Sequence, residues 1–144
     1  MDRLKLRAEL TRDEGLRLKP YRDSVGKLTI GIGRNLEDVG ISEIEAEYML
    51  MSDILGVERE LDKYAPWWRR MSDNRQRVLA NMAFNMGVGP SEENTTGKLL
   101  TFKHTLAAMK EERYLDAAEA MGHSKWATQV GQRAVRLIQM LREG

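Results

Sequence analysis

Four glycines and one proline interrupt the segment between Glu14 and Gly33, and together they exclude a continuous helix through it. Gly15 follows Glu14 directly, and glycine readily adopts the conformations that end a helix. The proline disfavours a helical conformation in the residue before it. We therefore expect a first helix over about residues 3–14, with Glu14 in its last turn, and a β-hairpin or small sheet over about residues 21–35.

Three polar residues lie at the helix end, the turn and the strand of this segment. Asp23 opens the sequence DSVGK, whose glycine suits a tight turn between extended pieces. Thr29 lies just beyond that turn, in an alternating stretch that is typical of a strand. These positions can bring Glu14, Asp23 and Thr29 to one cleft. Taken singly, such a glutamate is usually solvated and such an aspartate usually caps backbone amides.

The rest of the chain is predicted to be helical. Ser42 and Glu45 form a capping-box pattern, and apolar residues then recur at helical spacing to about Tyr64. An apolar stripe from Val78 to Met86 predicts a central core helix. Further helices are expected at about 99–110, at 112–121, around Trp126 and at 132–142, with a mobile loop at 87–97.

Composition limits the class of protein. A chain of 144 residues fits one domain, which we divide into an N-terminal part with a connecting helix at about 1–64 and a helical lobe at about 65–144. The absence of cysteine excludes disulfides, thiolate metal sites and a cysteine nucleophile. With 23 Lys and Arg against 22 Asp and Glu, no strong field favours nucleic acid. We expect neither a signal peptide nor a membrane span.

Metal and serine-hydrolase chemistry find no support in the sequence. His104 and His123 have no acidic or cysteine partners at zinc-ligand spacing, and there is no G-x-S-x-G elbow. We therefore expect no cofactor and no metal.

The segment around Glu14, Asp23 and Thr29 resembles the E-G-x-x-L-x-x-Y-x-D-x-x-G-x-x-T-I-G-x-G signature of phage-type (T4-like) lysozymes, glycoside hydrolase family 24. The resemblance recurs in NRQRVLANMAFNMG (74–87) and SKWATQVGQRAVRL (124–137), so it covers nearly the whole chain. It implies an α+β, mostly helical, lysozyme-like fold: a small N-terminal lobe with a β-hairpin or sheet, a long connecting helix and a helical C-terminal lobe.

The resemblance also implies a reaction, the hydrolysis of the β-1,4 bond between N-acetylmuramic acid and N-acetylglucosamine in peptidoglycan. Glu14 would be the general acid, partly desolvated so that it holds a proton near neutral pH. Asp23 would stay ionised and activate a water molecule that Thr29 helps to hold. A single displacement with inversion requires a carboxyl separation of roughly 6.5–9.5 Å.

Two further polar roles are carried over from the family. Arg34 stands where relatives commonly have a histidine, and Asp53 matches the helix position of that histidine's partner, so we predict a salt bridge between them. Two unpaired surface charges are the alternative. Arg133 matches an arginine that reaches the catalytic glutamate from the C-terminal lobe.

Substrate contacts are predicted from the same resemblance. The candidates are Asn35, Phe84 and Thr105, although Phe84 is equally suited to a core position. Tyr21 is expected to brace the hairpin, and for Trp126 packing is favoured over substrate contact.

The setting that the resemblance implies is lysis of a bacterial host by a phage or prophage. The protein would be a monomer that waits in the host cytoplasm, needs a holin-type membrane permeabiliser, and then acts on glycan strands in the periplasm. Its basic C-terminal helix is either an aid at an anionic outer membrane or, more commonly, a solvated face.

Two other functions stay open from the sequence. A lytic transglycosylase cleaves the same bond without a water-activating aspartate, and the presence of Asp23 and Thr29 argues against it. A non-catalytic wall-binding module would keep the fold, and the intact acid, aspartate and threonine argue against that.

Overall fold

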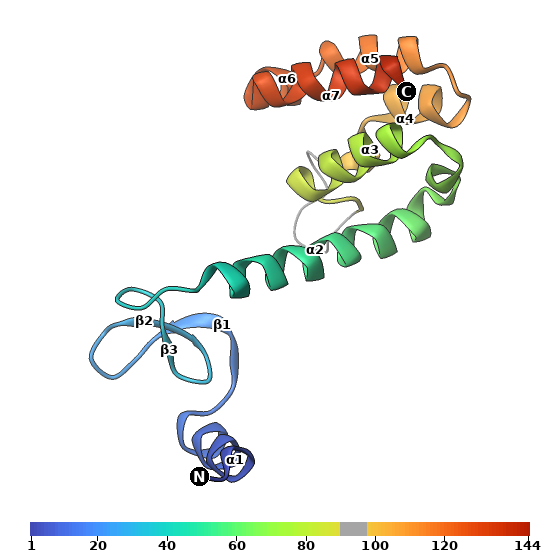
Figure 1. The fold of residues 1–144 in the computed structure, drawn as a ribbon. Helices are drawn as coiled ribbons and strands as arrows, with labels where there is room; N and C mark the ends of the chain where they lie inside the picture. The colour runs from blue at the N-terminus through green and yellow to red at the C-terminus, as the bar shows by residue number, and fades with distance from the viewer. Residues whose placement is uncertain (90–97) are drawn as a thin grey trace. The chain divides into compact units, whose positions relative to one another are not determined.

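The computed structural model describes residues 1–89 and 98–144, and it shows an α+β, mostly helical chain (Figure 1). The elements in order are α1 (Arg3–Glu14), β1 (Arg17–Arg22), β2 (Leu28–Gly31), β3 (Arg34–Asn35), α2 (Glu43–Tyr64), the 3₁₀ helix η1 (Pro66–Arg70), α3 (Asp73–Met86), the 3₁₀ helix η2 (Leu99–Thr101), α4 (Lys103–Lys110), α5 (Tyr114–Gly122), α6 (Lys125–Val130) and α7 (Gln132–Glu143). Most of the loop expected at 87–97 lies outside the described residues.

The chain forms two compact units, unit 1 (Met1–Met49) and unit 2 (Leu50–Gly144). The boundary lies inside α2, whereas the sequence analysis placed it after that helix. The description of one catalytic domain stays a prediction.

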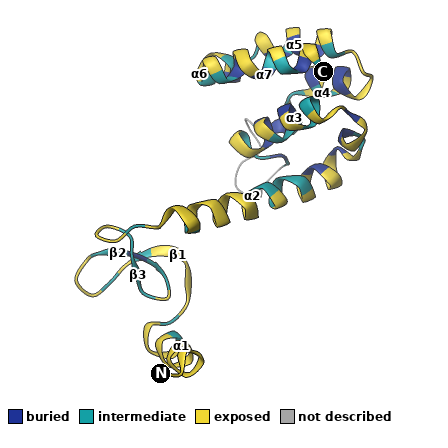
Figure 2. Cartoon of the chain, viewed as in Figure 1, coloured by how far each residue is buried: buried dark blue, intermediate teal, exposed yellow. Residues whose placement is uncertain are grey.

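Unit 1 contains α1 and a three-stranded antiparallel sheet in the order β1-β2-β3. Arg17 pairs with Gly31, so the sheet begins earlier than the expected residue 21. The difference arises because Pro20 is tolerated within β1: this strand lies at the edge of the sheet, where a missing N–H costs no ladder bond. The helix predicted at 3–14 is confirmed, but none of its residues is buried (Figure 2).

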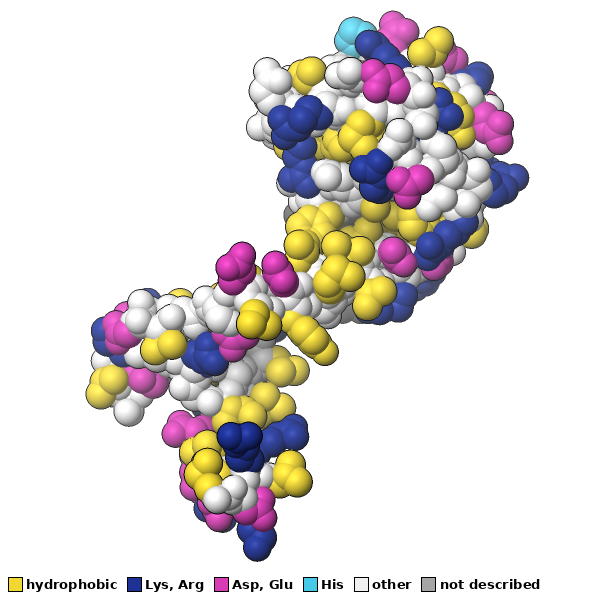
Figure 3. Space-filling model, viewed as in Figure 1, with side chains coloured by type: hydrophobic (Ala, Val, Ile, Leu, Met, Phe, Trp, Pro, Cys, Tyr) yellow, Lys and Arg dark blue, Asp and Glu magenta, His cyan; other side chains and the backbone are white. Residues whose placement is uncertain are grey.

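The start and end of α2 follow from local signals in the sequence. Ser42 Oγ accepts a bond from the Glu45 N–H at 3.2 Å, and Glu45 Oε2 accepts one from the Ser42 N–H at 2.8 Å, which confirms the capping box. The helix ends at Tyr64, two residues before Pro66. Apolar side chains remain exposed along it (Figure 3). None of the helices in the described residues combines the length and apolar content needed to cross a bilayer.

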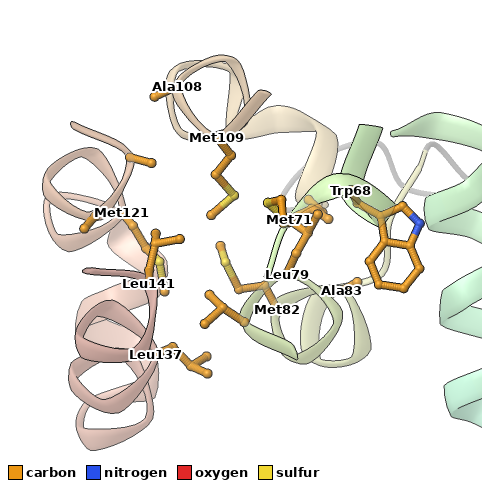
Figure 4. Close-up of a cluster of buried hydrophobic side chains, with 14 of the residues drawn as sticks. Trp68, Met71, Leu79, Met82, Ala83, Ala108, Met109, Met121, Leu137 and Leu141 are labelled. Atoms are coloured by element: carbon orange, nitrogen blue, oxygen red, sulfur yellow. The ribbon is translucent and has the colours of Figure 1, made fainter. Parts of the chain in front are cut away.

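The hydrophobic core lies in unit 2. The predicted stripe of α3 is buried there at Val78, Leu79, Met82 and Ala83, which confirms the central core helix. Figure 4 shows the four buried methionines of this core among leucines and alanines: Met71, Met82, Met109 and Met121. Flexible thioether side chains adapt to irregular gaps between helices.

One predicted helix of unit 2 is divided. The segment expected to be helical over 99–110 begins as the 3₁₀ helix η2, and α4 starts only at Lys103. The reason is Phe102, whose backbone (φ −79°, ψ 55°) is not helical. Glu112 then turns the chain into α5 with a φ of +60°.

Leu79 and Leu115 offer a matched test of where the core lies. Leu79 in α3 is fully buried, whereas Leu115 in α5 is 69% exposed. Leu79→Ala should lower the free energy of unfolding by about 2–5 kcal/mol, because it leaves a cavity. Leu115→Ala should change it by at most about 0.5 kcal/mol. Urea unfolding followed by circular dichroism measures both, and equal losses would contradict this core assignment.

Candidate functional site

Glu14 is the last residue of α1, and both ends of that helix are capped. At the N-terminus, Asp2 accepts bonds from the N–H groups of Leu4 and Lys5, each at 3.0 Å. At the C-terminus, Gly15 has a φ of +74° and donates to the Thr11 carbonyl. The helix therefore stops at the acid, and the Glu14 side chain is exposed.

Gly33, in the turn between β2 and β3, lies against the carboxylate of Glu14. A Cβ atom at this position would lie 2.7 Å from Glu14 Oε2, so close that the Glu14 side chain would have to shift. Gly33 also has a φ of +71°, which L side chains rarely adopt. The glycine is thus required both for the turn and for the close approach of the acid to the sheet.

Asp23 is fixed by the backbone of its own turn. Its Oδ1 accepts bonds from the N–H groups of Val25 at 3.0 Å and Lys27 at 2.8 Å. The Asp23 N–H donates to the Lys27 carbonyl at 3.0 Å, and Gly26, with a φ of +84°, completes the turn by donating to the Asp23 carbonyl. Asp23 Oδ2 has no hydrogen-bond partner among the described residues, so it is available to a ligand.

Thr29 lies on β2 and is only 3% exposed. Its hydroxyl donates to the Lys27 carbonyl at 2.9 Å, so that one residue binds both Asp23 and Thr29 through its backbone. In the sheet Thr29 lies opposite Tyr21 on β1 and Asn35 on β3. The sheet thus joins the Asp23 turn to Thr29, and Glu14, at the end of α1, lies against Gly33 in the turn between β2 and β3.

Asn35 and Tyr21 have contacts that support the sheet. The Asn35 side chain donates to Asp38 Oδ2 at 2.9 Å and accepts from the Asp38 N–H at 3.0 Å, so it caps the turn that follows β3. The Tyr21 ring lies beneath the guanidinium of Arg17, at 4.4 Å. Both residues belong to β1, and the bracing role of Tyr21 stays a prediction.

Arg34 has a different partner from the one predicted. Its guanidinium forms a bidentate salt bridge with Glu45, with N···O distances of 3.0 and 2.8 Å, and also donates to the Gly40 carbonyl. The predicted partner, Asp53, lies further along α2 and is exposed. Glu45 is favoured because the capping box already holds its carboxylate at the start of the helix. The bond from Arg34, with smaller effects from Ser42, lowers the pKa of Glu45 from 4.5 to about 2.

Unit 2 contains the other predicted residues. Phe84 is 44% exposed, whereas Thr105 is buried. Arg133 donates to Asn81 Oδ1 at 2.8 Å and to the Asn81 carbonyl. Trp126 is buried and donates to Asn85 Oδ1, which confirms its packing role.

A concave pocket of about 670 Å³ lies on unit 2. Apolar side chains from α2, α3 and α7 line much of it, including Ile54, Phe84 and Leu137, and Arg133 is among its polar residues. Of the two predicted sugar contacts in unit 2, Phe84 is therefore the better placed for a ligand.

A cluster of charged residues beside the Asp23 turn was missed by the sequence analysis. Glu37 accepts from Arg22 and from the Leu28 N–H, while Asp38 accepts from the ammonium group of Lys27 at 3.0 Å. The Leu28 amide, followed by Arg22, lowers the pKa of Glu37 below its ordinary value. Lys27 likewise lowers the pKa of Asp38. No group of three or more acidic or histidine side chains in the described residues is arranged to hold a metal ion.

Comparisons with known proteins identify the class of protein to which this chain belongs. The phage lysozyme family profile matches residues 11–140. The pre-baseplate central spike protein Gp5 of Enterobacteria phage T4 is 31% identical over 94% of this chain, which spans 27% of that protein's length. Probable T4-type lysozyme 1 of Dictyostelium discoideum is 27% identical over 92% of this chain and 90% of its own. A SAR-endolysin of Bacteriophage PS119 is 29% identical over 57% of this chain and 50% of its own.

The α+β architecture is thus that of a lysozyme, a glycoside hydrolase. The chain belongs to the phage lysozyme family.

Gly33 and Gly31 form a matched pair that tests the approach of Glu14. Both have a φ near +70°, but a Cβ at Gly31 would meet nothing within 4 Å. Alanine at either position should cost roughly 1–2 kcal/mol of backbone strain. Only Gly33→Ala should also move the ¹³C resonance of the Glu14 carboxyl carbon in NMR spectra. Equal shifts in the two variants would contradict the contact.

The Arg34 pair predicts a pH dependence with a defined sign. Because the folded-state pKa of Glu45 is depressed to about 2, its contribution to stability is present above pH 4.5 and is lost as the pH falls toward 2. Glu45→Gln should therefore unfold in less urea than the wild type at neutral pH, and the difference should vanish in acid. Double-mutant cycles should give coupling for Arg34 with Glu45 and none with Asp53; the reverse pattern would restore the original prediction.

Proposed function

We propose that this chain is a muramidase that hydrolyses the β-1,4 bond between N-acetylmuramic acid and N-acetylglucosamine in peptidoglycan. The observation that carries the proposal is the state of Asp23: backbone amides fix one carboxylate oxygen and leave the other free, in the turn that leads to Thr29. A fixed carboxylate with one open oxygen suits a base that must hold a water molecule in one orientation.

Thr29 complements Asp23 in holding that water. Its hydroxyl proton is already committed to the Lys27 carbonyl, so Thr29 Oγ1 is left as an acceptor. A water molecule has two protons, and we assign one to Thr29 Oγ1 and the other to Asp23 Oδ2. This leaves a lone pair of the water for the anomeric carbon.

Glu14 is assigned as the general acid. It gives its proton to the glycosidic oxygen as that bond breaks, while the water oxygen bonds to the anomeric carbon and its proton passes to Asp23. Attack on the opposite face inverts the configuration. In the free protein the Glu14 side chain is exposed, so a glycosidic oxygen can approach it.

Sugar contacts are proposed for Asn35 and Phe84, and more weakly for the buried Thr105. The partly exposed Phe84 ring offers an apolar face for a sugar ring. The role of Arg133 in positioning Glu14 stays a prediction from the family resemblance.

The biological setting that we propose is lysis of a bacterial host. The resemblance to a SAR-endolysin and to T4-type lysozymes supports it. In this setting the protein acts as a monomer on periplasmic glycan strands, after a holin-type partner has permeabilised the inner membrane.

Removal of each catalytic group tests the proposal. Glu14→Gln and Asp23→Asn should each abolish the clearing of chloroform-permeabilised Gram-negative cells, with losses of at least about 100-fold. Thr29→Ala should lose less, because Asp23 still holds the water. Mass spectrometry of the fragments released by the wild type should show hydrated reducing ends.

Asp13→Asn is the matched control for Glu14→Gln, because Asp13 is the adjacent acid on α1 and pairs only with Arg12 among the described residues. It should clear cells like the wild type. Anhydro sugar products would make the protein a lytic transglycosylase. A folded wild type that binds the wall without releasing fragments would make it a binding module.

A further inference from the structure

Glu37 lies in the turn after β3, and its carboxylate bonds to both sides of the β1–β2 hairpin. Its Oε1 accepts from Arg22 Nη1 at 2.8 Å and from the Leu28 N–H at 3.1 Å. These two donors lie directly opposite each other in the sheet, where Arg22 pairs with Leu28. One oxygen of Glu37 therefore joins the last residue pair before the hairpin turn.

The two donors to Glu37 are neighbours in the sequence of the two residues that we assign to holding the water. Arg22 immediately precedes Asp23, and Leu28 immediately precedes Thr29. The Arg22 guanidinium also donates to the Gly26 carbonyl at 2.8 Å, inside the Asp23 turn. Only one peptide unit separates each partner of Glu37 from a residue that we assign to holding the water. A displacement of Glu37 would therefore move both Asp23 and Thr29.

Lys27 extends the same arrangement. Its backbone binds Asp23 and Thr29, as described above, while its ammonium group lies 3.0 Å from Asp38 and 3.9 Å from Glu37 Oε2. Glu37 thus faces three donors, each belonging to a residue that adjoins or bonds to Asp23 or Thr29.

The Arg22–Glu37 ion pair is expected to contribute little to the stability of the fold. The side chains of Arg22 and Glu37 are 66% and 38% exposed, and exposed ion pairs add little to the free energy of folding. The same ion pair can still matter for the orientation of Asp23 and Thr29, because small displacements of reacting groups lower a reaction rate by large factors. In unit 1, where Thr29 alone is buried, apolar packing gives the hairpin little further support.

We propose that Glu37 is a positioning residue, which holds the ends of β1 and β2 so that Asp23 and Thr29 share one water molecule. This inference rests on the proposed function, since it acts through the two residues assigned there. It predicts an effect on turnover with no effect on substrate binding.

The test compares Glu37→Gln with Glu47→Gln and Asp23→Asn on soluble peptidoglycan fragments. Glu47 is an exposed residue of α2 with no hydrogen bond or ion pair among the described residues, so its variant should match the wild type. Glu37→Gln should lower kcat by about 10- to 100-fold with KM unchanged. In NMR titrations the Leu28 amide proton of the wild type should follow the ionisation of Glu37, and this response should be absent from the variant.

Each outcome decides between the two proposals. Wild-type kcat in Glu37→Gln, beside an inactive Asp23→Asn, would overturn the positioning role alone. An active Asp23→Asn would overturn the proposed function and the positioning role with it. If thermal melting shows that Glu37→Gln is unfolded, Arg22→Gln decides, because it breaks the same ion pair from the other side: a similar loss of kcat supports the role, and unchanged turnover overturns it.

Discussion

The rest of unit 1 depends on the two hydrogen bonds that Asp23 accepts from the backbone of its own turn. Within Met1–Met49 the only buried residue is Thr29, so burial of apolar surface supplies little of the force that shapes this part of the chain. Turn, strand pairing and side-chain contacts must define the geometry instead. An aspartate whose carboxylate satisfies two amides at once fixes where the hairpin reverses, and hence where Thr29 lies.

In the proposed mechanism, the same carboxylate divides its two oxygens between structure and chemistry. Oδ1 is committed to the turn, and Oδ2 is open. Thr29 shows a similar division, since its proton is committed to the Lys27 carbonyl and its oxygen remains an acceptor. Glu14 comes from α1, and its carboxylate can lie against the turn between β2 and β3 because Gly33 has no side chain. Two residues of the proposed site, Asp23 and Thr29, thus also satisfy a local structural need.

These local needs explain what the sequence predicts well. The end of α1 at Gly15, the Asp23 turn, the capping box of α2 and the buried stripe of α3 all follow from neighbouring residues. The partner of Arg34 does not, because either acid lies on the same helix and the choice depends on where the end of β3 meets it. Glu37 was missed for a similar reason: its contacts join the turn after β3 to the ends of β1 and β2, and its sequence surroundings resemble any charged surface loop.

The central claim is that Asp23 activates a water molecule for direct attack, and the configuration of the first product tests it most directly. The measurement is ¹H NMR of the anomeric protons during cleavage of a defined β-1,4-linked peptidoglycan oligosaccharide, recorded before mutarotation. The account predicts that the new reducing end appears first as the α-anomer. Initial release of the β-anomer would mean retention, and would contradict the role assigned to Asp23.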